Sequence, residues 1–141
     1  MPQLRQDPTT KEWVIIAAER SKRPHDFIKT EAVTEKPPYK EDCPFCQGNE
    51  HLTPHESLAY RSCGPADSKG WWVRVIPNKF PALSPEGSWE RKEEKGFFRM
   101  MDGMGIHEVV IESPIHNQLL PLMRINKWRR SFLPIGRGIL P

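Results

Sequence analysis

The sequence predicts an α+β fold that is rich in loops and built on a mostly antiparallel sheet. Its 141 residues include 15 prolines and 37% hydrophobic residues, and the mean hydropathy is −0.65. These values are poor for a single compact core of that size. The apolar residues that do occur gather in three short runs rich in β-branched side chains, which is typical of strands.

The three runs define the expected strands in chain order. Residues 13–17 follow turn-forming residues, and residues 71–77 contain a single charge, Arg74. Pro77 ends this second run because proline cannot donate to a β-ladder. Residues 107–113 form the third run, which Pro114 closes. We expect residues 28–42 to form a connecting loop and the charged residues 84–103 to form an excursion over the surface.

Composition also limits where this protein works. The N-terminus carries no apolar run and no eighteen consecutive residues are apolar, so we expect neither a signal peptide nor a membrane span, and a cytoplasmic location. Three cysteines, two of them in a C-x-x-C pair, fit a metal site in a reducing compartment better than a disulfide framework. Cys63 is then an ordinary free thiol.

The net charge of +3 is unevenly distributed. Residues 124–141 hold five basic residues and no acid, which leaves 16 basic against 18 acidic residues in 1–123. A basic tail on a nearly neutral body argues against a general nucleic-acid-binding surface. We therefore divide the chain into a domain over residues 1–123 and an atypical tail over residues 124–141, which we expect to be disordered or non-native.

The strongest chemical signal is the pair Cys43 and Cys46. Two thiolates at this spacing on a turn supply half of a tetrahedral zinc site, and no thioredoxin-like βαβ pattern surrounds them to favour a redox role. Two completions compete. His51 and His55 would make a local zinc knuckle, whereas His116 follows the third strand and could return to the turn through the sheet. Spacing alone does not decide between them.

Two further groups of residues suit a nucleotide ligand. Arg20 and Arg23 follow the first strand, where planar guanidinium groups could meet phosphate oxygens, although a solvated basic turn is the simpler interpretation. Asn78 could bond a base or ribose, and Phe80 could stack on a base, although a lone phenylalanine more often belongs to a core.

Five blocks of this sequence carry further information. They comprise residues 5–8 with 12–14, residues 20–24, residues 43–51, residues 73–83, and residues 105–114 with His116. No single block is specific, but the order of the five over residues 5–116 is. Together they resemble the galactose-1-phosphate uridylyltransferases, a branch of the histidine-triad superfamily.

The resemblance implies a histidine-triad-like domain that contains a structural zinc ion, held by Cys43, Cys46 and His116 rather than by the knuckle histidines. It also implies that Arg20 and Arg23 border the phosphates of a nucleotide sugar, and that Asn78 and Phe80 lie against the uridine. The activity implied is transfer of a uridylyl group from UDP-glucose to galactose 1-phosphate through a histidine nucleophile, as part of galactose metabolism.

The sequence departs from the family pattern at its C-terminal end. The family takes its nucleophile and fourth zinc ligand from a His-x-His segment, and this sequence contains none. We therefore expect an inactive N-terminal fragment of low stability, interrupted near residue 124, for which the family-like dimer is not expected. Ile115, where relatives usually place an acid, weakens the zinc assignment slightly. The alternatives are a small zinc knuckle that binds RNA or a protein, and a relative that transfers adenylyl groups.

Overall fold

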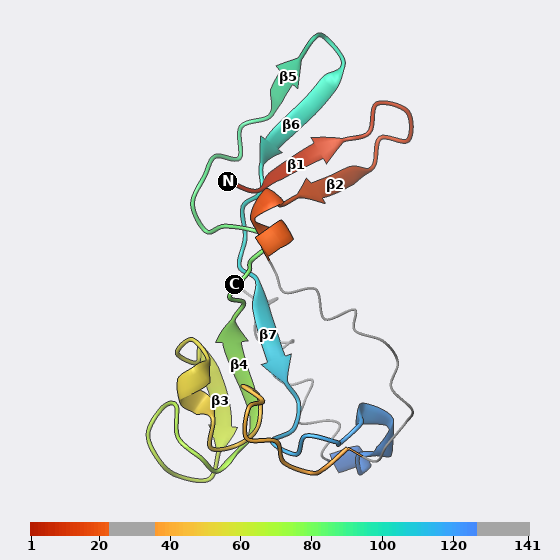
Figure 1. Cartoon of the computed structure of the whole chain (residues 1–141). Helices are drawn as coiled ribbons and strands as arrows, with labels where there is room; N and C mark the ends of the chain where they lie inside the picture. Colours follow the sequence, from red (N-terminus) through yellow and green to blue (C-terminus); the bar gives the residue numbers. More distant parts are fainter. Residues whose placement is uncertain (23–35, 127–141) are drawn as a thin grey trace. The chain divides into compact units, whose positions relative to one another are not determined.

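The computed structural model describes residues 1–22 and 36–126, so Arg23 and most of the predicted basic tail lie outside the described residues. The described chain divides into two compact units (Figure 1). Unit 1 contains residues 1–22 and 78–107, and unit 2 contains residues 36–77 and 108–126. Each unit is built around its own antiparallel sheet.

Unit 1 contains a four-stranded antiparallel sheet, in which β1 lies between β2 and β6 (Figure 1). The carboxylate of Asp7 shapes the turn between β1 and β2 by accepting the backbone N–H groups of Thr9 and Thr10 at 2.7 and 3.0 Å. The short 3-10 helix η1 (Ala18–Lys22) follows β2. The strands, in sheet order, are β2 (Trp13–Ile16), β1 (Gln3–Gln6), β6 (Phe98–Asp102) and β5 (Lys92–Glu94).

Unit 2 contains a three-stranded antiparallel sheet with β4 at its centre. The strand order is β3 (Leu58–Arg61), β4 (Trp71–Pro77) and β7 (Glu108–Ile111). The 3-10 helices η2 (Glu50–Leu52) and η3 (Leu120–Leu122) complete the unit. The core cluster consists of Trp71, Ile76 and Ile111, with Ala59 and Val109 packed against it. β4 is buried on both of its faces, which explains its nearly continuous apolar run.

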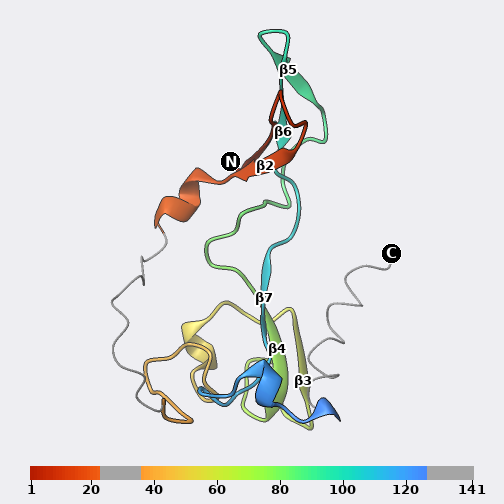
Figure 2. The same ribbon diagram turned by 90° about the vertical axis from the view of Figure 1, so that its right-hand side faces the viewer.

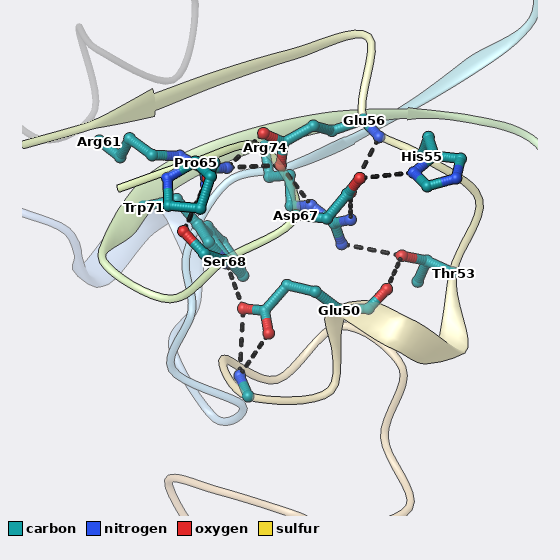
Figure 3. A network of polar contacts seen from close by, with 11 residues as sticks. Glu50, Thr53, His55, Glu56, Arg61, Pro65, Asp67, Ser68, Trp71 and Arg74 are labelled. Atoms are coloured by element: carbon teal, nitrogen blue, oxygen red, sulfur yellow. Dashed lines mark hydrogen bonds and ion pairs between the residues drawn. The ribbon is translucent and has the colours of Figure 1, made fainter. Parts of the chain in front are cut away.

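The one charge within β4 lies at the centre of a polar network (Figure 3). The side chain of Arg74 is 1% exposed, and its guanidinium donates to Glu56 at 2.9 Å, to Asp67 at 2.6 Å and to Thr53 at 2.8 Å. Arg61 pairs with the same Glu56 carboxylate. These bonds compensate the buried charge and attach the loop that flanks β3 to the central strand.

The structure confirms part of the predicted fold and corrects the rest. The three expected strands form, as β2, β4 and β7, but β2 belongs to a different sheet from the other two. The predicted surface excursion over residues 84–103 instead contains β5 and β6, which complete the sheet of unit 1. β1 and β3 were also missed. Both strands mix polar with apolar side chains and are mostly half-buried, so the sequence shows no clear strand alternation. The pairing of β3 with β4 also contains an irregularity between Tyr60 and Arg61.

The 3-10 helices of the described residues are short: η1, η2 and η3 are each only three to five residues long. Within residues 1–22 and 36–126, no helix is long and apolar enough to cross a membrane.

Candidate functional site

Cys43, Cys46 and His116 come together in unit 2. Their candidate ligand atoms all lie within 4.8 Å of one another, and Cys46 Sγ lies 3.5 Å from His116 Nδ1. Zinc bound tetrahedrally at about 2.3 Å from sulfur and about 2.05 Å from nitrogen would hold those two atoms about 3.5 Å apart. Two sulfurs and one imidazole nitrogen at this spacing therefore fit a zinc ion. Among the described residues, this is the only such group of three.

A buried amide holds the cysteine turn in shape. Asn49 is 5% exposed, and its Nδ2 donates to the carbonyl oxygens of Glu41 and Cys43 at 2.8 Å and of Lys40 at 3.2 Å. Gly48 adopts a φ of 106°, a left-handed conformation that a side chain would strain. The chain around the two thiols is therefore fixed by its own hydrogen bonds.

Glu50 connects this turn to the core of unit 2. Its carboxylate accepts the Gly48 N–H at 3.0 Å. It also accepts the indole N–H of Trp71 at 2.8 Å (Figure 3). Burial opposes ionisation of Glu50, but the bonds from Trp71 and Gly48, together with the charge of Arg74, lower its pKa. The ionised Glu50 carboxylate therefore connects the cysteine turn to β4.

His116 reaches the cysteines because its segment runs beside theirs. The His116 N–H donates to the Pro38 carbonyl at 2.8 Å, and the Asn117 side chain donates to the Lys36 carbonyl at 2.8 Å. Figures 1 and 2 both show the chain that follows β7 beside the chain that leads into the cysteine turn. Phe45, Glu112 and Met123 line a pocket together with the three candidate ligands.

The chemical state of the thiols follows from their surroundings. Burial raises the pKa of the Cys46 thiol, and the neighbouring Cys43 adds to the effect. A metal ion must therefore displace a proton that Cys46 holds firmly, so binding depends on pH.

The alternative knuckle is not assembled in the described residues. His55 Nδ1 lies 2.7 Å from Asp67 Oδ2, which makes His55 part of the polar network rather than a neighbour of the thiols (Figure 3). His51 is exposed and belongs to no group of candidate ligands. Of the two completions that the sequence left open, the structure brings His116 to the cysteines.

The second candidate site lies in unit 1, around the segment that follows β4. Arg20 Nη1 donates to the Phe80 carbonyl at 2.9 Å, and Asn78 Oδ1 accepts the Phe80 N–H at 2.8 Å. Three of the four predicted substrate-binding residues therefore meet at one stretch of backbone. The fourth, Arg23, lies outside the described residues.

His107 belongs to this site and was missed at the level of sequence. Its Nδ1 accepts the Ala82 N–H at 2.8 Å, its Nε2 lies 3.3 Å from Asn78 Nδ2, and its carbonyl accepts the Asn78 N–H at 2.9 Å. The register of the pairing between β4 and β7 places His107 in this site. β4 pairs with β7 so that Pro77 faces Glu108, and one more antiparallel step places Asn78 opposite His107.

With both sites described, comparison with known proteins identifies the family. Residues 1–130 match the model of the galactose-1-phosphate uridyl transferase N-terminal domain. The chain belongs to this family. The match covers both candidate sites and confirms the resemblance inferred from the five sequence blocks.

Individual relatives carry more than one enzymatic name. An ADP-glucose phosphorylase of Arabidopsis thaliana is 40% identical over 117 residues, which cover 82% of this chain and 32% of that protein. A galactose-1-phosphate uridylyltransferase of Thermotoga maritima is 31% identical over 127 residues, covering 90% of this chain and 32% of its own length. The chain thus spans about a third of these relatives.

Solved structures agree with this assignment. The crystal structure of the Arabidopsis ADP-glucose phosphorylase with bound ADP-glucose matches with a TM-score of 0.53 and 32% identity, over 99% of this chain and 37% of that one. A uridylyltransferase structure matches with a TM-score of 0.57 over 96% of this chain and 33% of the other, but at 19% identity it supports the fold alone.

Proposed function

We propose that this chain supplies the nucleotide-binding part of an enzyme that transfers nucleotidyl groups from a nucleoside diphosphate sugar to a sugar phosphate or phosphate. The observation that carries the proposal is the meeting of Arg20 and Asn78 at the backbone of Phe80. A cation, an amide and an aromatic ring are the three chemistries needed for phosphate, for a base or ribose edge, and for a base face.

Arg20 and Phe80 each retain groups that can contact a ligand. A guanidinium has five N–H donors, and the described structure uses one of those of Arg20 for the Phe80 carbonyl. The remaining donors can meet phosphate oxygens. Phe80 is half-buried, so part of its ring remains accessible for stacking, and the Lys79 ammonium lies 5.9 Å from the ring centre. The backbone bonds hold these groups in place before a ligand arrives, which reduces the entropy lost on binding.

These contacts suit more than one nucleotide base, so two candidate substrates follow. UDP-glucose, with a hexose 1-phosphate as acceptor, corresponds to the uridylyltransferase relatives. ADP-glucose is the second candidate, because the relative with 40% identity is named an ADP-glucose phosphorylase. Both nucleotides share the ribose and diphosphate that Arg20 would recognise, so direct competition between them at this site is the informative comparison.

Zinc would serve a structural purpose in this proposal. Held by Cys43, Cys46 and His116, the ion would join the cysteine turn to the segment after β7 and so stiffen unit 2. In the family pattern the fourth ligand and the nucleophile come from a His-x-His segment, and these 141 residues contain none. We therefore expect this chain alone to bind nucleotide without forming a covalent nucleotidyl intermediate.

Calorimetric titration of the 141-residue protein with UDP-glucose and with ADP-glucose tests the proposal. Arg20→Ala and Asn78→Ala should each weaken binding about tenfold, because each removes one charged or directional hydrogen bond. Arg99→Ala is the matched control, since Arg99 is an exposed arginine on β6 of the same unit. Absence of binding to both nucleotides, or equal binding by all variants, would contradict the proposal. A labelled nucleotidyl-protein adduct would contradict the expected inactivity.

A further inference from the structure

We propose that His107 contacts the nucleotide directly, by donating from Nε2 to the same ligand oxygen that accepts a hydrogen bond from Asn78 Nδ2. This inference rests on the proposed function and adds a residue to its site. The observation behind it is a short contact between two nitrogen atoms that are both hydrogen-bond donors.

The protonation state of His107 follows from its backbone contact. The Ala82 N–H points at Nδ1 over 2.8 Å, so Nδ1 must present its lone pair. In a neutral imidazole the single proton then resides on Nε2. Protonation of Nδ1 would break the bond to Ala82.

The orientation of Asn78 is fixed by a second backbone contact. Its Oδ1 accepts the Phe80 N–H at 2.8 Å, which leaves Nδ2 as the amide atom that lies 3.3 Å from His107 Nε2. Reversing the amide would place its NH₂ against the Phe80 N–H, and reversing the imidazole ring would place a carbon against the Ala82 N–H. The orientation described is the one that keeps both backbone bonds.

Two donors therefore lie side by side, and the described residues offer neither of them an acceptor. Donor groups 3.3 Å apart repel unless an acceptor lies between them and takes a hydrogen bond from each. An oxygen with two lone pairs, about 2.9 Å from both nitrogens, satisfies this geometry. A nucleotide offers such oxygens on the base, the ribose and the phosphates, whereas a cation would be repelled by the two N–H groups.

Two substitutions separate ligand contact from loop support. His107→Asn can retain an acceptor for the Ala82 N–H, because Asn Oδ1 can occupy the place of Nδ1, but it removes the donor at Nε2. His107→Gln does the reverse, because its amide nitrogen can reach the place of Nε2 while the acceptor for Ala82 is lost. If His107 only supported the loop, His107→Asn would bind like the wild type and His107→Gln would be weakened.

The experiment combines calorimetry with two NMR measurements on the 141-residue protein. We expect His107→Asn to weaken UDP-glucose binding about tenfold while Ala82 amide-exchange protection is retained, and His107→Gln to bind more tightly than His107→Asn. Long-range ¹H–¹⁵N spectra of the ligand-free protein should show the proton on Nε2. An effect of equal size with ADP-glucose places the acceptor on the shared ribose diphosphate, and an effect limited to UDP-glucose places it on a uracil carbonyl.

The outcomes separate this inference from the proposed function. Wild-type protein that binds neither nucleotide overturns both. Wild-type protein that binds while His107→Asn binds equally well, or a proton found on Nδ1 in the ligand-free protein, overturns the role of His107 and leaves the proposed function standing.

Discussion

The two units differ in how they are held together. Every buried hydrophobic residue in the described part of the chain belongs to unit 2; these are Cys46, Trp71, Val73, Val75, Ile76, Ile111 and Met123. In unit 1, by contrast, Val14, Ile15 and Ile16 of β2 are 44–49% exposed. Unit 2 has a core of its own, whereas the sheet of unit 1 depends mainly on backbone pairing.

The polar side chains of the two units also differ, in whether they have hydrogen-bond partners. In unit 2, Arg74 and Glu50 are buried, and each is hydrogen-bonded to side chains of the same unit. In unit 1, Asn78 and His107 present donors for which the described residues supply no acceptor. Satisfied buried groups stabilise a fold, and unsatisfied preorganised groups suit a ligand. The contrast supports the proposal that unit 2 would supply rigidity and the candidate metal site, and that unit 1 would supply the nucleotide contacts.

The largest expected effect comes from the core of unit 2. Trp71→Ala removes a side chain that is 2% exposed and leaves the Glu50 carboxylate without its indole donor, so it should destabilise unit 2 by about 3–5 kcal/mol. Hydrogen exchange should show faster exchange for amides of β4 and β7, while protection in β1 changes little. Trp89→Ala, at a side chain 66% exposed in unit 1, is the control. Equal loss of hydrogen-exchange protection in both units would contradict the claim that unit 2 has a core of its own.

Acidification should weaken unit 2 through Asp67. Although burial opposes ionisation, hydrogen bonds from His55 and Arg74 lower the pKa of Asp67 from 3.8 to about 2. Because the folded pKa lies below the unfolded one, the stabilisation is complete above pH 4 and is lost as the pH falls toward 2.

Denaturant titrations between pH 5 and pH 2 measure this contribution. We expect about 1–2 kcal/mol, after allowance for screening by solvent, and Asp67→Asn should remove that part of the pH dependence. Identical pH profiles for the wild type and Asp67→Asn would show that the network does not stabilise the ionised form.

The smallest expected effect lies on β2. Ile15→Thr should change stability by less than about 0.5 kcal/mol because Ile15 is 49% exposed. The matched change Ile76→Thr, at a residue 3% exposed in β4, should cost more than about 2 kcal/mol, since it buries a hydroxyl in the core. Similar costs at both positions, measured by denaturant unfolding, would mean that β2 is covered in solution.

Much of unit 2 was predictable from sequence and little of unit 1 was. β4 is buried on both faces and is apolar along most of its length, so its composition reveals it. β5 (Lys92–Glu94) is exposed and charged along its length, and only its backbone pairing to β6 makes it a strand. The side-chain pattern of β5 does not indicate its pairing with β6.

The candidate sites show the same limit. Cys43 and Cys46 are visible from their spacing, but the choice between His116 and the nearby histidines depends on how the chain after β7 returns. His55 lies closer in sequence and pairs with Asp67 instead. His107 was missed because its place opposite Asn78 depends on the register of β4 and β7, which a single sequence does not reveal.

The candidate metal site offers the most direct test of the roles proposed for the two units. Zinc content and zinc-edge X-ray absorption of the 141-residue protein should show one ion per chain with two sulfur ligands at about 2.3 Å and at least one nitrogen ligand. Cys46→Ser and His116→Ala should lower zinc affinity, and His51→Ala should leave it unchanged. Zinc lost in His51→Ala and retained in His116→Ala would contradict the account and favour the knuckle.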